Sequence, residues 1–339
     1  MAPSAVTPPS SIISRSNSST KPTLYLLDIF HPAAIERARE LFTVVLPSDP
    51  EFVDWPQHAK YLLIRASYLT ASQIEAAPHL LAIGKQGVGT DRVDAAACAA
   101  RGIKIFNTPG VNSRAVAELV LSLTTSLARQ IRPISLRVAR GEVVRKEECD
   151  GLILHGCTLG LVGMGNIGRK VAEIFRGAFE SDIVTFDPYM GAGAWSDLPH
   201  KRVTKLEDLL KVSDVVSLHA PLTSETRGLL SYDQLAMMKR SALLINAARG
   251  GIVDEADLER ALDDGLIWGA GLDCHEQEPP TQQRYEKLWK HPNVISLPHI
   301  GAATSQTQRE TATAAVENLY AYVKQTEEAA SAAAVHEVL

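Results

Sequence analysis

Three ionisable side chains within a span of fifty positions are the residues best suited to chemistry in this chain. Arg249 ends the segment NAAR, Glu278 lies in HEQEPP and His299 lies in LPHIGAAT, and each follows a run with the pattern of a buried strand. A guanidinium can bind a carboxylate through two hydrogen bonds, and an imidazole beside a carboxylate can donate a proton near neutral pH. Together these groups suit the reduction of a 2-oxo acid, in which the arginine holds the acid group and the histidine protonates the carbonyl oxygen.

A glycine-rich turn precedes these three residues. Gly163, Gly165 and Gly168 follow the apolar run TLGLV and open a helical pattern, and Asp187 closes the next strand-like run 24 positions after Gly163. This context is the fingerprint of a dinucleotide site. The first glycine permits a tight turn, the second lets a pyrophosphate approach the backbone, and the third lets helix and strand pack closely. The pyrophosphate would lie at the positive end of the helix dipole.

Asp187 also bears on the choice of dinucleotide. A carboxylate at this position accepts hydrogen bonds from both ribose hydroxyl groups and repels a 2′-phosphate, so we expect NAD rather than NADP. The residues that follow directly are Pro188 and Tyr189, not an arginine. The basic segment 200–202, His-Lys-Arg, is the one sequence feature that favours tolerance of the phosphate.

The surrounding pattern predicts two α/β blocks. Short apolar runs alternate with helical patterns over residues 23–109 and again over residues 158–299, as expected for parallel strands covered by helices on both faces. Between the blocks, a helix is expected to begin at Asn112 or Ser113. It is apolar nearly all round, so we expect it to lie between domains or subunits. A last helix is expected over residues 305–325.

Composition and charge exclude several classes of protein. A length of 339 residues suggests about two domains, and a net charge of −5 argues against binding to nucleic acid or to an anionic membrane. No apolar run approaches the ~18–20 residues of a membrane span, and the Ser- and Pro-rich residues 1–22 lack a secretory signal and indicate a disordered tail. We expect a cytoplasmic protein without a metal site, and reduced thiols at all four cysteines, Cys98, Cys149, Cys157 and Cys274.

Four segments resemble, in their sequences and in their order along the chain, those of the NAD-dependent D-2-hydroxyacid dehydrogenase family: GMGNIG, NAARGGIVDE, LDCHEQEPP and LPHIGAAT. The D-3-phosphoglycerate dehydrogenase and glyoxylate/hydroxypyruvate reductase branches are the most similar, and the resemblance covers residues 23–325. It implies an α/β fold of two Rossmann-like domains with parallel sheets and an active-site cleft between them. The substrate-binding domain would be discontinuous, residues 23–111 and 305–325. The NAD-binding domain would be residues 112–304, followed by a flexible tail, 326–339.

The resemblance also implies roles for single residues. It implies a homodimer that interconverts a D-2-hydroxy acid and its 2-oxo acid with NAD(H), with Arg249, Glu278 and His299 as catalytic residues. Of the two carboxylates near this point, the family pattern selects Glu278 over Glu276. The other implied residues bind ligands: Gly163, Gly165, Asn166, Ile167, Gly168, Asp187, Ala220, Ala247, Ala248, Asp273 and Gly301 bind the cofactor, and Arg65, Val88 and Gly89 bind the substrate.

Several features leave the substrate open. Where the family usually has an apolar residue and an aromatic one, this chain has Cys274 and His275, and the polar ring of His275 either alters substrate preference or reaches solvent. Arg65 and Lys85 favour a phosphorylated substrate, whereas glyoxylate, hydroxypyruvate and bulkier 2-oxo acids are the alternatives. A rival function is an NAD-sensing scaffold, since corepressors resemble the same fold. We expect neither a long partner-recruiting tail nor an appended regulatory domain.

Overall fold

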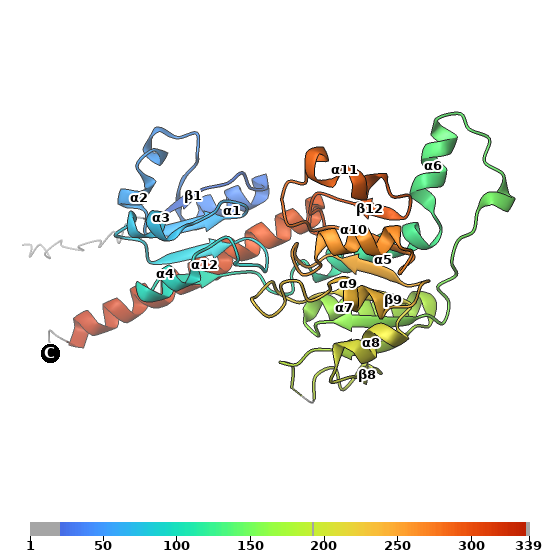
Figure 1. The fold of residues 1–339 in the computed structure, drawn as a ribbon. Helices are drawn as coiled ribbons and strands as arrows, with labels where there is room; N and C mark the ends of the chain where they lie inside the picture. Colours follow the sequence, from blue (N-terminus) through green and yellow to red (C-terminus); the bar gives the residue numbers. More distant parts are fainter. Residues whose placement is uncertain (1–20, 192, 337–339) are drawn as a thin grey trace, which may run out of the picture.

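The computed structural model describes residues 21–191 and 193–336, which form two α/β units (Figure 1). Each unit is built on one sheet whose strands are all parallel, five strands in the first unit and seven in the second. The expected fold class, α/β with two parallel Rossmann-like sheets, is therefore confirmed. The tail expected at residues 1–22 lies, up to residue 20, outside the described residues.

The first sheet has the strand order β2-β1-β3-β4-β5. Strands β3 and β4 are buried along their whole length, which is why the sequence shows continuous apolar runs there rather than alternation. The elements of this unit are β1 (Thr23–Leu26), α1 (Pro32–Leu41), β2 (Thr43–Val45), a 3₁₀ helix (Pro50–Phe52), α2 (Trp55–His58), β3 (Tyr61–Ile64), α3 (Ala71–Glu75), β4 (Ala82–Lys85), α4 (Ala95–Ala100) and β5 (Lys104–Phe106).

Helix α12 (Ser305–His336) follows the second unit in the chain but packs on the first sheet, against α1, β4 and β5 (Figure 1). Ala315 and Leu319 are fully buried there with strand residues of that sheet. The approach is close: a Cβ added to Gly84 of β4 would lie 2.9 Å from Leu63 Cδ1 and 3.1 Å from the carbonyl oxygen of Ala315. Packing on the first sheet therefore depends on a glycine at this position.

The second sheet has the order β12-β11-β10-β9-β6-β7-β8. The direction of winding reverses between β6 and β9, and ligands of such sheets bind beyond the carboxyl ends of the strands at that point. The elements of this unit are α5 (Ser113–Ala128), α6 (Ile131–Ala139), a 3₁₀ helix (Lys146–Glu148), β6 (Thr158–Val162), α7 (Asn166–Phe179), β7 (Asp182–Phe186), β8 (Lys201–Arg202), α8 (Leu206–Val212), β9 (Val215–Leu218), α9 (Tyr232–Ala236), β10 (Leu243–Asn246), α10 (Glu255–Asp263), β11 (Gly269–Leu272), α11 (Gln282–Lys290) and β12 (Val294–Ser296).

Helix α5 packs against α7 and the second sheet. Its expected position between domains or subunits stays a prediction. The elements not predicted from sequence are the short strand β8, helices α2, α6 and α11, and the two 3₁₀ helices. Residues 326–336, expected in a flexible tail, continue α12 instead, as their Ala- and Glu-rich composition favours. None of the helices in the described part of the chain is long and apolar enough to cross a membrane.

The packing of α12 on the first sheet can be tested with Leu319→Ala. Leu319 is fully buried, so we expect the free energy of unfolding of the first unit to fall by ~2–5 kcal/mol, because apolar burial is lost and a cavity is left. Urea unfolding monitored by circular dichroism measures the change. Gln325→Ala, at an exposed position of the same helix, is the control and should change stability by less than ~0.5 kcal/mol. Equal stability of the two variants would contradict the described packing.

Candidate active site

The turn after β6 has the shape required by a phosphate-binding turn. Gly163 has a φ of 104°, and a Cβ added to it would lie 2.7 Å from the carbonyl oxygen of His219. A Cβ on Gly168 would lie 2.5 Å from the carbonyl oxygen of Gly163, so both positions require glycine. A Cβ on Gly165 would meet no atom within 4 Å, and α7 begins there without a side-chain cap. This open space and the uncapped N–H groups fit a dinucleotide pyrophosphate.

Asp187 lies beside this turn, directly after β7. Its carboxylate accepts hydrogen bonds from the backbone N–H groups of Met164 (2.8 Å) and Tyr189 (3.0 Å), which fix its orientation. Its oxygens keep lone pairs for ribose hydroxyl groups. Arg202, from the basic segment that favoured phosphate tolerance, instead donates to the backbone carbonyls of Asp187 (2.6 Å) and Gly191 (2.9 Å). The geometry therefore favours NAD over NADP.

The other residues expected at the cofactor lie near the same edge of the second sheet. Asn166 and Ile167 form the first turn of α7. The backbone nitrogen of Ala220 lies 3.0 Å from where a Cβ on the first glycine of the turn would be. Ala247 and Ala248 are buried just after β10. Their contacts with a cofactor stay predictions.

Arg249 follows β10 and reaches the first unit. Its Nε donates to Asp91 Oδ1 (3.0 Å), and its Nη1 donates to the backbone carbonyl of Ala248 (2.7 Å). Gly89 lies directly against the guanidinium, since a Cβ added there would lie 1.6 Å from Nη2. Val88, on the same loop, has 37% of its surface exposed. The structure thus brings together the arginine and the glycine-rich loop that the sequence assigned to the substrate.

Arg65 and Lys85 lie at the carboxyl ends of the neighbouring strands β3 and β4. Arg65 is exposed, with Nη1 3.5 Å from Gln308 Oε1. Lys85 is buried, and its ammonium donates to the backbone carbonyls of Arg65 (2.8 Å) and Gln86 (2.6 Å). Burial lowers the pKa of Lys85 to about 8. Of the two cations, Arg65 is therefore the freer to meet a ligand.

The imidazole of His299 contacts Glu278. Nδ1 lies 2.9 and 3.1 Å from the two carboxylate oxygens. Glu276, the other carboxylate near this point in the sequence, pairs with Arg284 instead. Burial would raise the pKa of Glu278, but the hydrogen bond with His299, the charge of that ring and the charge of Arg92 hold it below its usual value. The contact therefore joins His299 to the carboxylate that the family pattern selects.

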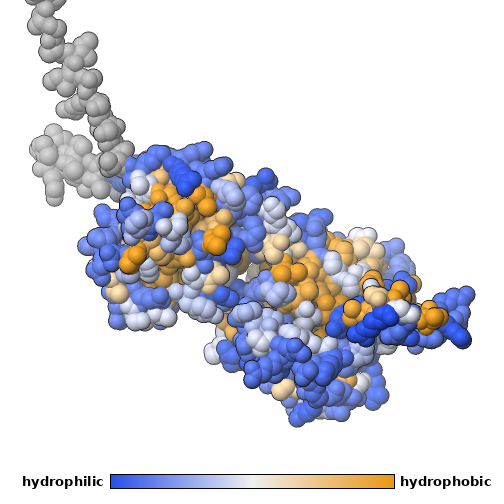
Figure 2. Space-filling model, turned by 90° about the horizontal axis from the view of Figure 1, so that it is seen from above, coloured by the Kyte–Doolittle hydropathy of each residue, from blue (hydrophilic) through white to orange (hydrophobic). Residues whose placement is uncertain are grey.

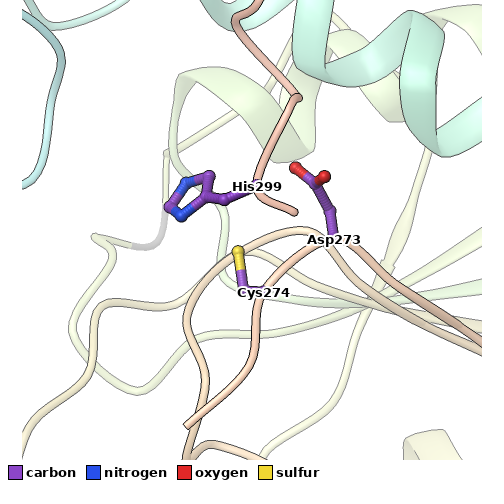
Figure 3. A group of neighbouring side chains, drawn as sticks. All are labelled: Asp273, Cys274 and His299. Carbon is purple, nitrogen blue, oxygen red and sulfur yellow. The ribbon is translucent and has the colours of Figure 1, made fainter. Parts of the chain in front are cut away.

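Asp273, directly after β11, holds the loop that carries His299 (Figure 3). Its two oxygens accept hydrogen bonds from the backbone N–H groups of Ile300 (2.7 Å) and Gly301 (2.8 Å). These bonds stabilise the left-handed backbone of His299, whose φ of 60° is costly for a residue other than glycine. Burial raises the pKa of Asp273 in spite of the bonds. The expected role of Asp273 and Gly301 at the cofactor stays a prediction.

Cys274 and His275 are both buried. The ring of His275 packs on Tyr285, with centroids 4.9 Å apart, so the interpretation that it reaches solvent is wrong. Burial lowers the pKa of His275 to about 4, so the ring is neutral at pH 7. Cys274, Asp273 and His299 place potential ligand atoms within 4.8 Å of one another (Figure 3). Burial raises the pKa of the Cys274 thiol, which donates to the backbone carbonyl of Ala248 (3.3 Å), so we assign no metal site here.

Two contacts of the site were not predicted from sequence. The consecutive residues Asp91 and Arg92, in the loop between β4 and α4, each pair with one residue of the second unit. Asp91 pairs with Arg249 (3.0 Å), and Arg92 Nη2 lies 3.3 Å from Glu278 Oε2. Adjacent opposite charges after a glycine-rich segment were the available signal. Nothing in the sequence shows which loop of the second unit they face.

The glycine turn, Arg249 and His299 lie beyond the carboxyl ends of strands of one sheet, so a dinucleotide and a small acid bound there would meet. That arrangement defines the class as a dinucleotide-dependent oxidoreductase. Residues 121–301 match the family model described as D-isomer specific 2-hydroxyacid dehydrogenase, NAD binding domain. The chain belongs to this family and is an NAD-dependent oxidoreductase that acts on the CH–OH group of 2-hydroxy acids.

The relatives agree with this assignment. The chain is 40% identical to the hydroxypyruvate reductase of Thermotoga maritima over 260 residues, 76% of this chain and 83% of the relative. It is 35% identical to the D-3-phosphoglycerate dehydrogenase of Methanocaldococcus jannaschii over 300 residues, 87% of this chain but 56% of the relative. A D-lactate dehydrogenase of Aquifex aeolicus, solved with NAD and lactic acid, has a TM-score of 0.77 at 27% identity and matches 90% of this chain and 96% of its own. The scaffold alternative is not supported.

Cofactor preference can be tested at Asp187. The double variant Asp187→Ser/Pro188→Arg removes the carboxylate that repels a 2′-phosphate and adds a cation that can bind one. We expect kcat/KM with NADH to fall and kcat/KM with NADPH to rise. Steady-state kinetics with both cofactors measure the change, and Pro188→Arg alone shows how much the cation contributes. Equal use of NADPH and NADH by the unchanged protein would contradict the role given to Asp187.

Proposed function

We propose that Arg249, Glu278 and His299 carry out the interconversion of a small 2-oxo acid and its D-2-hydroxy acid. Arg249 binds the acid group, and His299, paired with Glu278, exchanges a proton with the carbonyl oxygen. The observation that carries this proposal is the contact between His299 and Glu278, 2.9 Å, beyond the strand ends of the sheet that bears the dinucleotide turn. An imidazole fixed by a carboxylate in this way is a competent general acid and base near neutral pH.

Arg249, His299 and Glu278 have different roles in the reduction. NADH, when bound, supplies the hydride that adds to the carbonyl carbon. The Nε of Arg249 is held by Asp91, which leaves the Nη2 edge beside Gly89 to face the substrate carboxylate. His299 gives its proton to the carbonyl oxygen, and Glu278 stabilises the imidazolium before the transfer. In oxidation the same ring takes the proton from the hydroxyl group.

Hydroxypyruvate and glyoxylate are the substrates that we propose first. The chain covers 83% of a relative named hydroxypyruvate reductase. The ammonium of Lys85 is bound to two backbone carbonyls and is therefore poorly placed to bind a phosphate. The exposed Arg65 favours 3-phosphohydroxypyruvate as the second candidate. NADH oxidation with glyoxylate, hydroxypyruvate, 3-phosphohydroxypyruvate and pyruvate tests the order, and a higher kcat/KM for the phosphorylated acid would reverse it.

We further propose that the protein is a cytoplasmic homodimer. Five large apolar side chains are exposed on α6 and the segment that follows it, which project from the second unit (Figures 1 and 2). Apolar residues gathered on a projecting segment favour contact with another chain. The four cysteines are free, as expected in a reducing compartment. The exposed apolar residues are Ile131, Leu136, Val138, Val143 and Ile153.

The role of Arg249 can be tested with Arg249→Lys. Lysine keeps the positive charge but loses the planar fork that binds a carboxylate through two hydrogen bonds. We expect kcat/KM for the 2-oxo acid to fall by roughly 10²-fold or more, a loss of about 3 kcal/mol of transition-state stabilisation. The affinity for NADH, measured by fluorescence titration, should hardly change. An unchanged kcat/KM would remove Arg249 from the site.

The pairing of His299 can be tested by the pH dependence of reduction. The reaction needs the protonated imidazole, so kcat/KM should fall as pH rises. Glu278→Gln removes the charge that stabilises this form, and we expect the falling limb to move to lower pH while activity at acidic pH partly survives. Glu276→Gln is the matched control, because Glu276 pairs with Arg284, and should leave the limb in place. The opposite result would show that His299 acts with Glu276.

A further inference from the structure

Arg92 belongs to the first unit but contacts Glu278 of the second unit, the carboxylate that is paired with His299. Its Nη2 lies 3.3 Å from Glu278 Oε2, in an ion pair whose side chains are 27% and 21% exposed. On its own unit, Nη1 donates to the backbone carbonyl of Ala66 (2.7 Å), and the guanidinium lies 5.0 Å from the centre of the Tyr68 ring. Two contacts thus hold the cation in place, and a third brings it against the carboxylate that contacts His299.

The position of Arg92 has an electrostatic consequence for His299. Both oxygens of Glu278 lie within 3.1 Å of Nδ1, and one of them also faces Arg92. A carboxylate in contact with the ring stabilises the imidazolium, whereas a cation on the far side of the same carboxylate destabilises it. The partial burial of the ion pair limits the screening of this charge by water.

We propose that Arg92 is a positioning residue that acts through Glu278 and His299, and that its charge sets the upper pH limit at which His299 can donate a proton. The inference rests on the proposed role of His299 as the acid. Arg92 does not have to touch substrate or cofactor for this effect. It limits how strongly Glu278 favours the protonated ring.

The other ionisable groups around His299 do not replace Arg92. Asp273 interacts electrostatically with His299 and is bound to the loop backbone. His275 is neutral, because burial lowers its pKa to about 4, and burial raises the pKa of the Cys274 thiol, so that it is uncharged. Among the described residues, Arg92 is the one cation besides a protonated His299 that pairs with Glu278.

Charged residues farther from His299 act on Arg92 and on substrate binding rather than directly on Glu278 and His299. Asp91 pairs with Arg249, so this neighbouring pair adds little net charge. Lys85 interacts electrostatically with Arg92. The pKa of Lys85 is lowered to about 8, and burial is the largest cause. Loss of the Lys85 proton as pH rises would change the charge near Arg249, the residue proposed to bind the substrate. The rate at saturating substrate is therefore the appropriate kinetic measure.

Arg92→Gln in the full-length protein tests the inference. We expect the falling limb of kcat, at saturating substrate and NADH, to move to higher pH. The shift should be about half to one pH unit, so that the rate above the midpoint is roughly threefold to tenfold that of the unchanged protein. Proton NMR of the His299 ring, which needs no turnover, should show the same displacement of its titration midpoint. Arg92→Lys retains the charge and should restore most of the original profile.

Arg260→Gln is the matched control. Arg260, on α10, likewise lies over a tyrosine ring, Tyr232 at 4.2 Å, and pairs with a carboxylate, Asp257 at 3.4 Å, but it touches none of the groups around His299. It should change neither profile. An unmoved NMR midpoint in Arg92→Gln, or one that moves to lower pH, overturns the inference. A midpoint that moves while the kcat profile stays supports the charge effect and overturns the proposed role of His299 as the acid.

Discussion

The backbone N–H groups of Ile300 and Gly301 donate to the carboxylate of Asp273, a side chain with 1% of its surface exposed. The buried carboxylate of Asp273 and the left-handed backbone of His299 both depend on this contact for their stability. A carboxylate removed from water costs several kcal/mol unless donors surround it, and the left-handed backbone of His299 costs about 1–2 kcal/mol unless the loop is held. Because β11 supplies the carboxylate, the direction of the imidazole is fixed by the sheet itself. The contact between His299 and Glu278 depends on this arrangement.

Most of the fold could be predicted because its strands are buried on both faces. Strand β3 reads YLLI and β10 reads LLIN, and such uninterrupted apolar runs separated by helical patterns indicate a parallel sheet. Helix α11 escaped prediction because only Tyr285 and Leu288 of its nine residues are buried, too few to give a helical period. The packing of α12 on the first sheet was expected from family resemblance alone, since nothing local in its sequence distinguishes one sheet from the other.

The candidate site likewise contains a part that could be predicted from the sequence and a part that could not. Arg249 and His299 could be placed together because both follow strands of one parallel sheet, and the carboxyl ends of such strands share an edge. The contacts of Asp91 and Arg92 could not, because they depend on how two separate sheets approach each other. His275 shows a third limit: its chemical type suggested solvent or substrate, whereas the observed side chain is packed on Tyr285. Burial of a polar ring is decided by neighbours that come from distant parts of the chain.

The chain passes between the two units twice, after β5 and again before α12. These passages lie together, since a Cβ added to Gly301, just before α12, would lie 3.3 Å from Cγ2 of Val116 in the first turn of α5. A rotation of one unit against the other would therefore use a single hinge. Asp91 and Arg92 would move away from their partners, whereas Asp273, Glu278 and His299 would move as one rigid body. Opening of the molecule would thus free Arg249 from Asp91, so that it can bind a different acid group, while the contact between His299 and Glu278 is kept.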